Sequence, residues 1–247
     1  MKCKILILFI IISSLLFFAN LEFGFGISAG TTMEFSYVDY YAGNTIEASS
    51  RIDSGLSVTA FLDIVDNFEL PNGGVLSSIS VLFETGYNHY MRVRTRNKDI
   101  PDYKHKFYYH NIIFGVLPKL NFNYGISLGI GAGIFLPLYS ETGKRSEKSN
   151  DGLSSYFYDE YEKFNFEKIS YMYKVPIMPY IKLNVEKYFY FSEKWAFKIG
   201  ANMIYNFGIE FDMDNLRKNI TRYTFDEYKF SSLSFEVFFD FGFGRPK

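Results

Sequence analysis

The side chains of this 247-residue sequence that are best suited to chemistry are its three histidines. His89, His105 and His110 lie within or near a basic stretch between residues 92 and 106. A histidine works as a catalytic base when a nucleophile lies within hydrogen-bond reach and a third group orients the pair. Nothing in the spacing fixes such a nucleophile beside any of the three, so we expect no catalytic residues and no enzyme.

Other chemical motifs are also lacking in the sequence. Cys3 is the only cysteine, the histidines lack metal-ligand spacing, and no glycine-rich loop follows a strand in the pattern that holds phosphates. We therefore expect no metal and no cofactor. The formal net charge of −1 argues against nucleic acid as a partner, since nucleic-acid-binding surfaces are basic.

The segment Tyr124–Leu138 shows how the remaining residues are positioned. Gly125, Ser127, Gly129, Gly131 and Gly133 occupy one face at a period of two, and large apolar residues occupy the other. A column of glycines weakens a strand but suits the crowded inside of a narrow closed barrel. We expect it to make room for Lys174, Lys182 and Met178 of the following strand.

The same alternation recurs along the chain and predicts eight strands. Their expected ranges are 23–37, 52–64, 75–90, 107–117, 124–138, 171–186, 195–209 and 229–243. The connections at 38–51, 92–106, 139–170 and 211–228 are long and polar, whereas the others are short, with turns at Pro71–Gly74 and Pro118–Lys119. Long loops at one end and short turns at the other are typical of an eight-stranded transmembrane up-and-down barrel, an all-β antiparallel fold.

The small or polar face of each strand carries scattered charges, which would line the lumen. They are Glu34, Asp63, Glu84, Lys174, Lys182, Glu186, Lys198, Glu236 and Asp240. Isolated buried ions cost several kcal/mol each, so these side chains must pair or remain wet. Two interpretations stay open: a salt-bridged plug, since eight strands leave an interior just wide enough for side chains, or a narrow hydrophilic pore.

Two further groups are candidate sites at the long-loop end. Arg92, Arg94 and Arg96 continue an inward phase and would form a cationic ladder at the mouth, which could pair with Glu34 or attract anions. The simpler alternative is a solvated loop tip. Tyr156, Phe157, Tyr158 and Tyr161 lie in the longest loop, and aromatic residues dominate binding hot spots. They are candidates for contacts with a host or extracellular protein, unless the loop only shields the surface.

Residues 1–19 combine Lys2 and Lys4 with an apolar run and predict a secretory signal peptide, which would leave a barrel of residues 20–247. The alternative is an uncleaved anchor, although the run is shorter than the ~20 apolar residues of a spanning helix.

On this pattern the chain resembles the small eight-stranded outer-membrane proteins of the OmpA/OmpX type. The resemblance covers Phe23 to Phe243 and includes the aromatic-ended last strand, Phe239, Asp240, Phe241, Gly242 and Phe243, which is similar to the signal read by the barrel-insertion machinery. It departs from the family in the tail 244–247. The resemblance implies the outer membrane of a diderm bacterium, with outer-membrane lipid and that machinery as partners.

For function, the resemblance favours a non-enzymatic surface protein with a structural role, extended to adhesion or host interaction through the outer loops. The alternatives are a narrow pore or transporter of small or apolar molecules, a lipid-modifying outer-membrane enzyme, and a soluble lipocalin-like carrier whose apolar face encloses a ligand.

Overall fold

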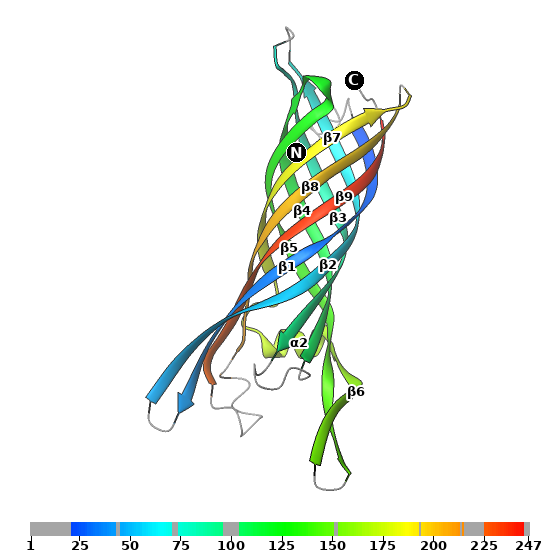
Figure 1. Cartoon of the computed structure of the whole chain (residues 1–247). Helices are drawn as coiled ribbons and strands as arrows, with labels where there is room; N and C mark the ends of the chain where they lie inside the picture. The colour runs from blue at the N-terminus through cyan, green and yellow to red at the C-terminus, as the bar shows by residue number, and fades with distance from the viewer. Residues whose placement is uncertain are drawn as a thin grey trace, which may run out of the picture.

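Period-two alternation becomes long antiparallel strands in the computed structural model of the chain (Figure 1). The structure describes residues 21–42, 45–70, 74–95, 104–150, 153–192, 194–212, 214 and 225–244. The predicted signal peptide, residues 1–19, lies outside the described residues. The elements are β1 (Leu21–Ala42), β2 (Thr45–Glu69), β3 (Leu76–Thr95), β4 (Lys104–Phe122), η1 (Asn123–Gly125), β5 (Ile126–Asn150), β6 (Leu153–Asn165), α2 (Phe166–Met172), β7 (Met178–Tyr190), β8 (Trp195–Glu210) and β9 (Phe225–Phe243).

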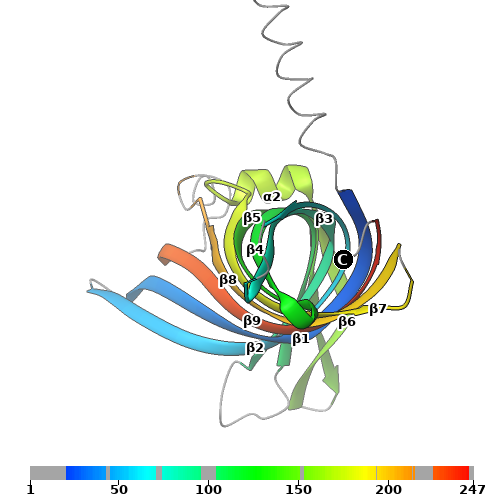
Figure 2. The same cartoon turned by 90° about the horizontal axis from the view of Figure 1, so that it is seen from above.

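Eight of these strands close into a barrel, and the view along its axis shows the ring (Figure 2). Each barrel strand pairs antiparallel with the next barrel strand along the chain, with β5 pairing directly with β7. The seam is formed by β1 and β9, which pair from Phe23 opposite Phe243 to Tyr40 opposite Phe225. The predicted eight-stranded antiparallel barrel is confirmed.

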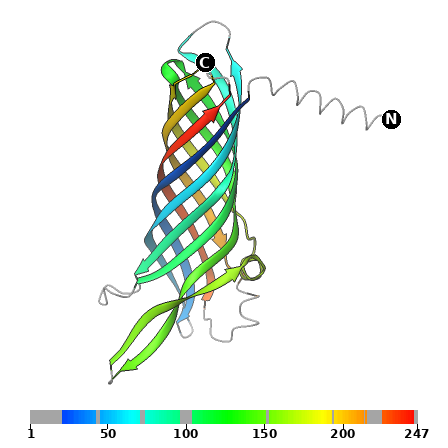
Figure 3. The ribbon, with the colours of Figure 1, turned by 90° about the vertical axis from the view of Figure 1, so that its right-hand side faces the viewer.

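The two ends of the barrel differ in what connects the strands (Figures 1 and 3). The start of β1, the end of β9 and the short connections lie together at one end, which we call the turn end. The β1–β2 and β5–β6 hairpins and α2 lie at the other, which we call the outer end. An even strand count returns the chain to the side where it began, as in outer-membrane barrels.

Several strands continue into regions expected to be loops. β1 and β2 run through most of 38–51 and remain paired up to Ala42 opposite Thr45. In the expected loop 139–170, β5 continues to Asn150 and returns as β6, so this segment is a hairpin followed by a short helix. Polar composition predicted loops here, but paired strands that project into water have no need of an apolar face.

Two strand boundaries were predicted wrongly. The turn expected at Pro118–Lys119 is strand, because β4 continues to Phe122. The reversal lies at Tyr124 and Gly125, whose φ angles of 72° and 69° form a tight turn with two left-handed residues. The strand expected to begin at Tyr171 begins at Met178 as β7, after α2 and after Pro176, which lacks a backbone donor.

The helix α2 begins at a polar cap. Asn165 precedes it, and the side-chain oxygen of Asn165 accepts a hydrogen bond from the backbone N–H of Lys168 at 3.0 Å. Among the described residues, no helix is long and apolar enough to cross a membrane.

Candidate functional site

The two faces of the barrel wall have opposite polarity. Outward residues such as Phe25 and Ile27 are 57% and 61% exposed, whereas the inward Glu34 and Lys198 are fully buried. On β4 the outward apolar residues run from Ile112 to Phe122, which spans roughly 25 Å at the usual rise and tilt and matches the apolar belt of an outer-membrane barrel.

An apolar exterior around an ionic interior is stable only where lipid surrounds the protein. The chain is an outer-membrane β-barrel. The soluble carrier weighed above is wrong, because such a carrier would place its apolar face inside and its polar face outside. At the turn end the belt is edged by aromatic residues, including Trp195 and Phe243, whose rings lie 4.7 Å apart between centroids at a tilt of 54°.

The turn-end half of the lumen is organised around one lysine. The Lys198 ammonium lies 2.9 Å from a Glu22 oxygen and 3.2 Å from an Asp63 oxygen, and it also forms an ion pair with Asp240. The ring of Tyr188 lies 5.5 Å from the same nitrogen. All four charged side chains are at most 5% exposed, so each carboxylate is held by the same buried ammonium.

Two further ion pairs cross the lumen next to this cluster. Lys119 donates to Glu186 at 2.7 Å, and both side chains are almost fully buried. Lys182 donates to one oxygen of Glu84 at 2.5 Å, while the Tyr180 hydroxyl donates to the other at 2.6 Å. Each carboxylate therefore meets at least one donor, as buried ions require.

Nearer the outer end, the charges become fewer and neutral hydrogen bonds take over. The Asn88 amide donates to Ser57 at 2.8 Å and to Thr59 at 2.9 Å. Glu236 is a charged exception, and its carboxylate accepts a hydrogen bond from the Ser28 hydroxyl at 2.6 Å. Each of these side chains is buried.

One ion pair remains at this level. Arg92 Nε lies 2.8 Å from a Glu34 oxygen, and the Tyr90 hydroxyl donates to the second Glu34 oxygen at 2.8 Å. The Arg92 guanidinium also lies over the Phe107 ring, 5.1 Å from its centroid. Arg92 thus closes the lumen as a paired side chain rather than attracting anions from outside.

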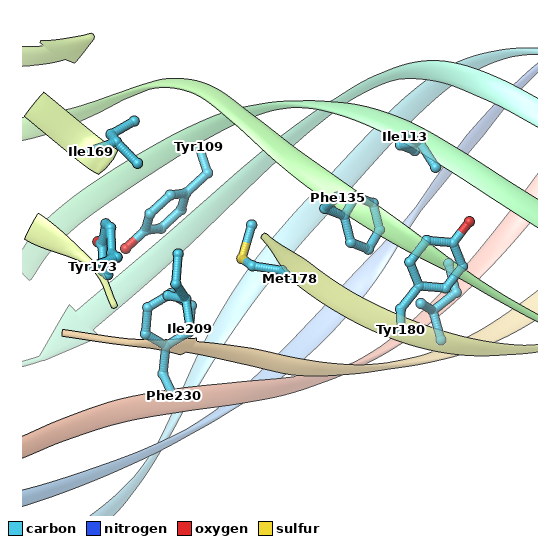
Figure 4. Close-up of a cluster of buried hydrophobic side chains, with 10 residues drawn as sticks. Tyr109, Ile113, Phe135, Ile169, Tyr173, Met178, Tyr180, Ile209 and Phe230 are labelled. Carbon is cyan, nitrogen blue, oxygen red and sulfur yellow. The ribbon is translucent and has the colours of Figure 1, made fainter. Parts of the chain in front are cut away.

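The outer end of the lumen is closed by apolar and aromatic side chains, which we call the outer cap (Figure 4). The outer cap consists of Tyr109, Ile113, Phe135, Ile169, Tyr173, Met178, Tyr180, Ile204, Ile209 and Phe230. Ile169 belongs to α2 and is 1% exposed, so the helix contributes this one buried side chain to the outer cap while its other residues stay exposed or half-buried. Tyr173, which directly follows α2, is also buried in this cap.

The predicted lumen charges can now be placed. Buried inside the barrel or nearly so are Glu34, Asp63, Glu84, Lys182, Glu186, Lys198, Glu236 and Asp240. The prediction that Lys174 lines the lumen is wrong. Its side chain is 55% exposed and forms an ion pair with Glu210 at the outer end, because β7 begins four residues after it.

The other two candidate groups are only partly described. Of the expected cationic ladder, Arg92 is buried; Arg94 is described only as part of β3, and Arg96 lies outside the described residues. The backbone of β6 carries the four aromatic candidates of the longest loop, Tyr156, Phe157, Tyr158 and Tyr161, and their side chains lie outside the described ones. At the base of this hairpin a hydrogen bond to Glu141 raises the pKa of Lys163.

Sequence reasoning missed two lumen ions, Lys119 and Glu22. Lys119 was placed in a turn, although the alternation of Leu117, Lys119 and Asn121 against Leu120 continues the strand. Glu22 lies one residue before the predicted start of the first strand. Extending the period-two pattern past each apparent boundary would have found both.

The glycine column of β5 lies inside the barrel, as its alternation predicts, but it faces different neighbours. A Cβ at Gly131 would lie 2.3 Å from the Val116 carbonyl oxygen, and one at Gly133 would lie 2.5 Å from the Tyr180 hydroxyl. The column therefore accommodates the backbone of β4 and the Tyr180 ring rather than Lys174 and Met178.

The spaces left between the described lumen side chains are small. One cavity near Asn88 and Phe135 has a volume of about 30 Å³, and another near Lys182 and Asp240 has about 10 Å³. A larger polar recess of about 370 Å³ opens at the turn end, lined in part by Glu22. A cavity of about 10–15 Å³, measured in the same way, holds one water, so these two interior cavities have room for no more than about three waters each.

Two of the three histidines lie on the outward face at the outer edge of the apolar belt. His89 of β3 and His110 of β4 are direct cross-strand neighbours, and their contacts are with Tyr87, Tyr108 and Tyr139. Neither is positioned against a described serine or cysteine. Among the described residues, no three His, Cys, Asp or Glu side chains gather as metal ligands.

Comparison with known proteins yields fold-level similarity only. No family model and no curated protein matches the chain. Similar solved structures include the outer membrane protease OmpT from Escherichia coli (9% identity, 92% of this chain and 97% of that chain, TM-score 0.37). Others are Neisserial surface protein A (11%, 87% and 95%, 0.33) and Ail, the attachment invasion locus protein of Yersinia pestis (12%, 88% and 97%, 0.29). At such low scores, function has to be argued from this chain's own residues.

Proposed function

We propose that this protein is a non-enzymatic, non-conducting surface protein whose barrel anchors an interaction hairpin outside the cell. The observation that carries the proposal is the β5–β6 hairpin, which projects from the outer end of a barrel whose lumen is filled (Figure 3). The expected partner is a host or extracellular protein.

The length of β5 supports an exposed hairpin. A strand of 25 residues, tilted as in outer-membrane barrels, spans roughly 60 Å, more than twice the apolar belt of about 25 Å. Beyond Tyr139 the sequence of β5 is polar and charged, so this part belongs in water. Pairing with β6 from Asn165 down to Leu153 makes the extension a two-stranded ribbon rather than a loose loop.

The hairpin carries two features that suit protein recognition. β6 pairs with β5 alone among the described strands, so its other edge can accept an added strand through backbone hydrogen bonds. Its sequence also places four aromatic residues within six positions, Tyr156 to Tyr161, and aromatic side chains dominate binding hot spots.

The filled lumen argues against the pore alternative. Ion pairs and hydrogen bonds occupy its turn-end half, and the outer cap occupies the rest. We therefore expect the purified protein to give no single-channel steps in a planar bilayer. The histidine pair gives the lipid-modifying alternative no support, since its described contacts are with tyrosines and with each other.

A hairpin-truncation experiment tests the adhesive role. Residues 143–162 are replaced by an Asn-Gly turn, and cells displaying the variant are compared with wild type for adhesion to surfaces coated with extracellular-matrix proteins. We expect adhesion to fall to the level of cells without the protein, with heat-modifiable gel mobility unchanged.

The matched control shortens the β1–β2 hairpin instead, by replacing residues 40–47 with the same turn. This control should keep its adhesion. Equal adhesion by the 143–162 variant and wild type, or no adhesion by wild type above the background, would refute the proposal.

A further inference from the structure

The outer rim of β3 and β4 carries a histidine pair with a geometry that suits a metal ion. His89 and His110 lie directly opposite each other in the antiparallel register. Their Nδ1 atoms are 3.4 Å apart, and the ring centroids are 4.6 Å apart. The Nδ1 atoms of the two rings therefore face each other.

The separation of the nitrogens matches one coordination geometry. Two imidazole nitrogens bound to a tetrahedral Zn²⁺ at about 2.0–2.1 Å each lie roughly 3.3–3.4 Å apart. A square-planar ion would hold neighbouring nitrogens closer together, at roughly 2.8 Å, and is the geometry that Cu²⁺ prefers. The spacing of this pair fits a tetrahedral ion better than a square-planar one.

The pair is also held in place by its neighbours. The His110 ring stacks on Tyr139 with centroids 3.9 Å apart and planes 13° apart, and the His89 ring stacks on Tyr108. The Tyr87 oxygen forms a close contact with His110 Nδ1 and adds a third donor atom beside the pair. The Tyr87 oxygen and His89 Nδ1 therefore both approach His110 Nδ1. The single lone pair of that nitrogen cannot accept a hydrogen bond from both neighbours.

The position of the pair allows an ion to reach it from outside. His110 lies two residues before Ile112, which is the outermost apolar outward residue of β4, so the pair lies at the outer boundary of the belt. Glu141 continues the same outward face of β5, two residues beyond Tyr139, and its carboxylate pairs with Lys163 at 3.1 Å, so the two charges beside the site offset each other. His110 is nearly buried, whereas His89 is half-buried and Tyr87 is 40% exposed, which leaves the open side toward the exterior.

From these observations we infer that His89 and His110 form a surface Zn²⁺ site, with the Tyr87 oxygen beside it and water completing the coordination. A bound ion would link β3 to β4 at the outer boundary of the apolar belt. The inference is independent of the adhesive role proposed for the β5–β6 hairpin.

Calorimetric titration of Zn²⁺ into the folded, detergent-solubilised protein without an affinity tag tests the inference. We expect saturable binding of one ion per chain. His89→Asn and His110→Asn should each weaken it at least about tenfold, since even the residues that only orient a ligand contribute about 10- to 100-fold. Two separate variants are used so that a folding defect in the more buried position does not leave the site untested.

The third histidine of the chain provides the matched control. His105→Asn should bind Zn²⁺ with an affinity within about twofold of wild type, and heat-modifiable mobility shows that each variant is folded. The inference fails if wild type shows no saturable binding, or if folded His89→Asn binds as wild type does. It also fails if His105→Asn weakens binding as much as the other two.

Discussion

The two halves of the lumen are filled by different chemistry. At the turn end, Lys198 and its three carboxylates form a buried ionic network together with the Lys119–Glu186 pair. At the outer end, the outer cap closes the mouth with aromatic and aliphatic side chains, including Ile169 of α2. The first half requires every ion to keep its partner, whereas the second tolerates changes of shape, so the same kind of mutation should have different costs in the two.

The largest effect is expected from filling the glycine column beside the ionic half. In the double variant Gly129→Leu, Gly131→Leu, the new side chains would meet Leu117 and the Val116 carbonyl oxygen at once. Overpacking usually costs about 1–3 kcal/mol per site, and more where backbone blocks the way, so no folded barrel should form. The measurement is heat-modifiable gel mobility after refolding; a normal shift would show that this wall is not packed.

Removing the central cation of the ionic half should come next. Lys198→Met leaves Glu22, Asp63 and Asp240 buried without their shared partner, and breaking a buried ion pair costs about 3–5 kcal/mol. The free energy of unfolding in lipid vesicles can be followed by urea titration, with the emission of Trp195 as the probe.

Lys174→Met is the matched control, since Lys174 also pairs with a glutamate but is 55% exposed. Exposed pairs contribute about 0–1 kcal/mol, so this variant should unfold almost as wild type does. Equal losses in the two lysine variants would contradict the division between a buried ionic half and the rest.

A smaller effect is expected in the outer cap. Ile169→Ala removes a buried side chain from α2 and should cost about 2 kcal/mol, at the low end for such a truncation because the helix can resettle. Planar-bilayer recording of this variant should still show no conductance, because the ionic half remains filled. Steady channel steps would mean that the cap alone seals the lumen.

The smallest effect is expected where the two halves meet. Tyr180→Phe keeps the ring but removes the hydroxyl that donates to Glu84 at 2.6 Å, while Lys182 remains as a partner. A hydrogen bond to a charged group contributes about 1.5–3 kcal/mol, and the retained ion pair should keep the loss near the lower figure. The midpoint of urea unfolding measures this loss of stability. An unchanged midpoint would mean that the ion pair with Lys182 alone stabilises the buried Glu84 carboxylate.

Within the apolar belt, period-two alternation in the sequence predicts both the barrel and the residues that face its lumen. Glu84, Lys198 and Asp240 were predicted to line the lumen on this basis alone. Alternation does not reveal partners across the lumen, however. The Lys198 pair with Glu22 joins residues 176 positions apart, and it depends on the tilt and stagger of strands that are not neighbours.

The outer end was less predictable for a different reason. Once strands leave the lipid, no apolar face is needed, so the pattern that marks β5 up to Leu138 stops while the strand continues to Asn150. The same loss of pattern hid α2 and misplaced Lys174 in the lumen. The sequence places His89 and His110 21 positions apart, and only the register between β3 and β4 shows that they are direct cross-strand neighbours.

The seam between β1 and β9 sets the order in which this molecule can be completed. The strand made first pairs with the strand made last, so the ring stays open until almost the whole chain exists. Before then, both β1 and β8 present a row of backbone groups that lipid cannot satisfy. A chain cut short before Phe225 therefore cannot settle into a smaller version of the same barrel, and its insertion must be all or nothing.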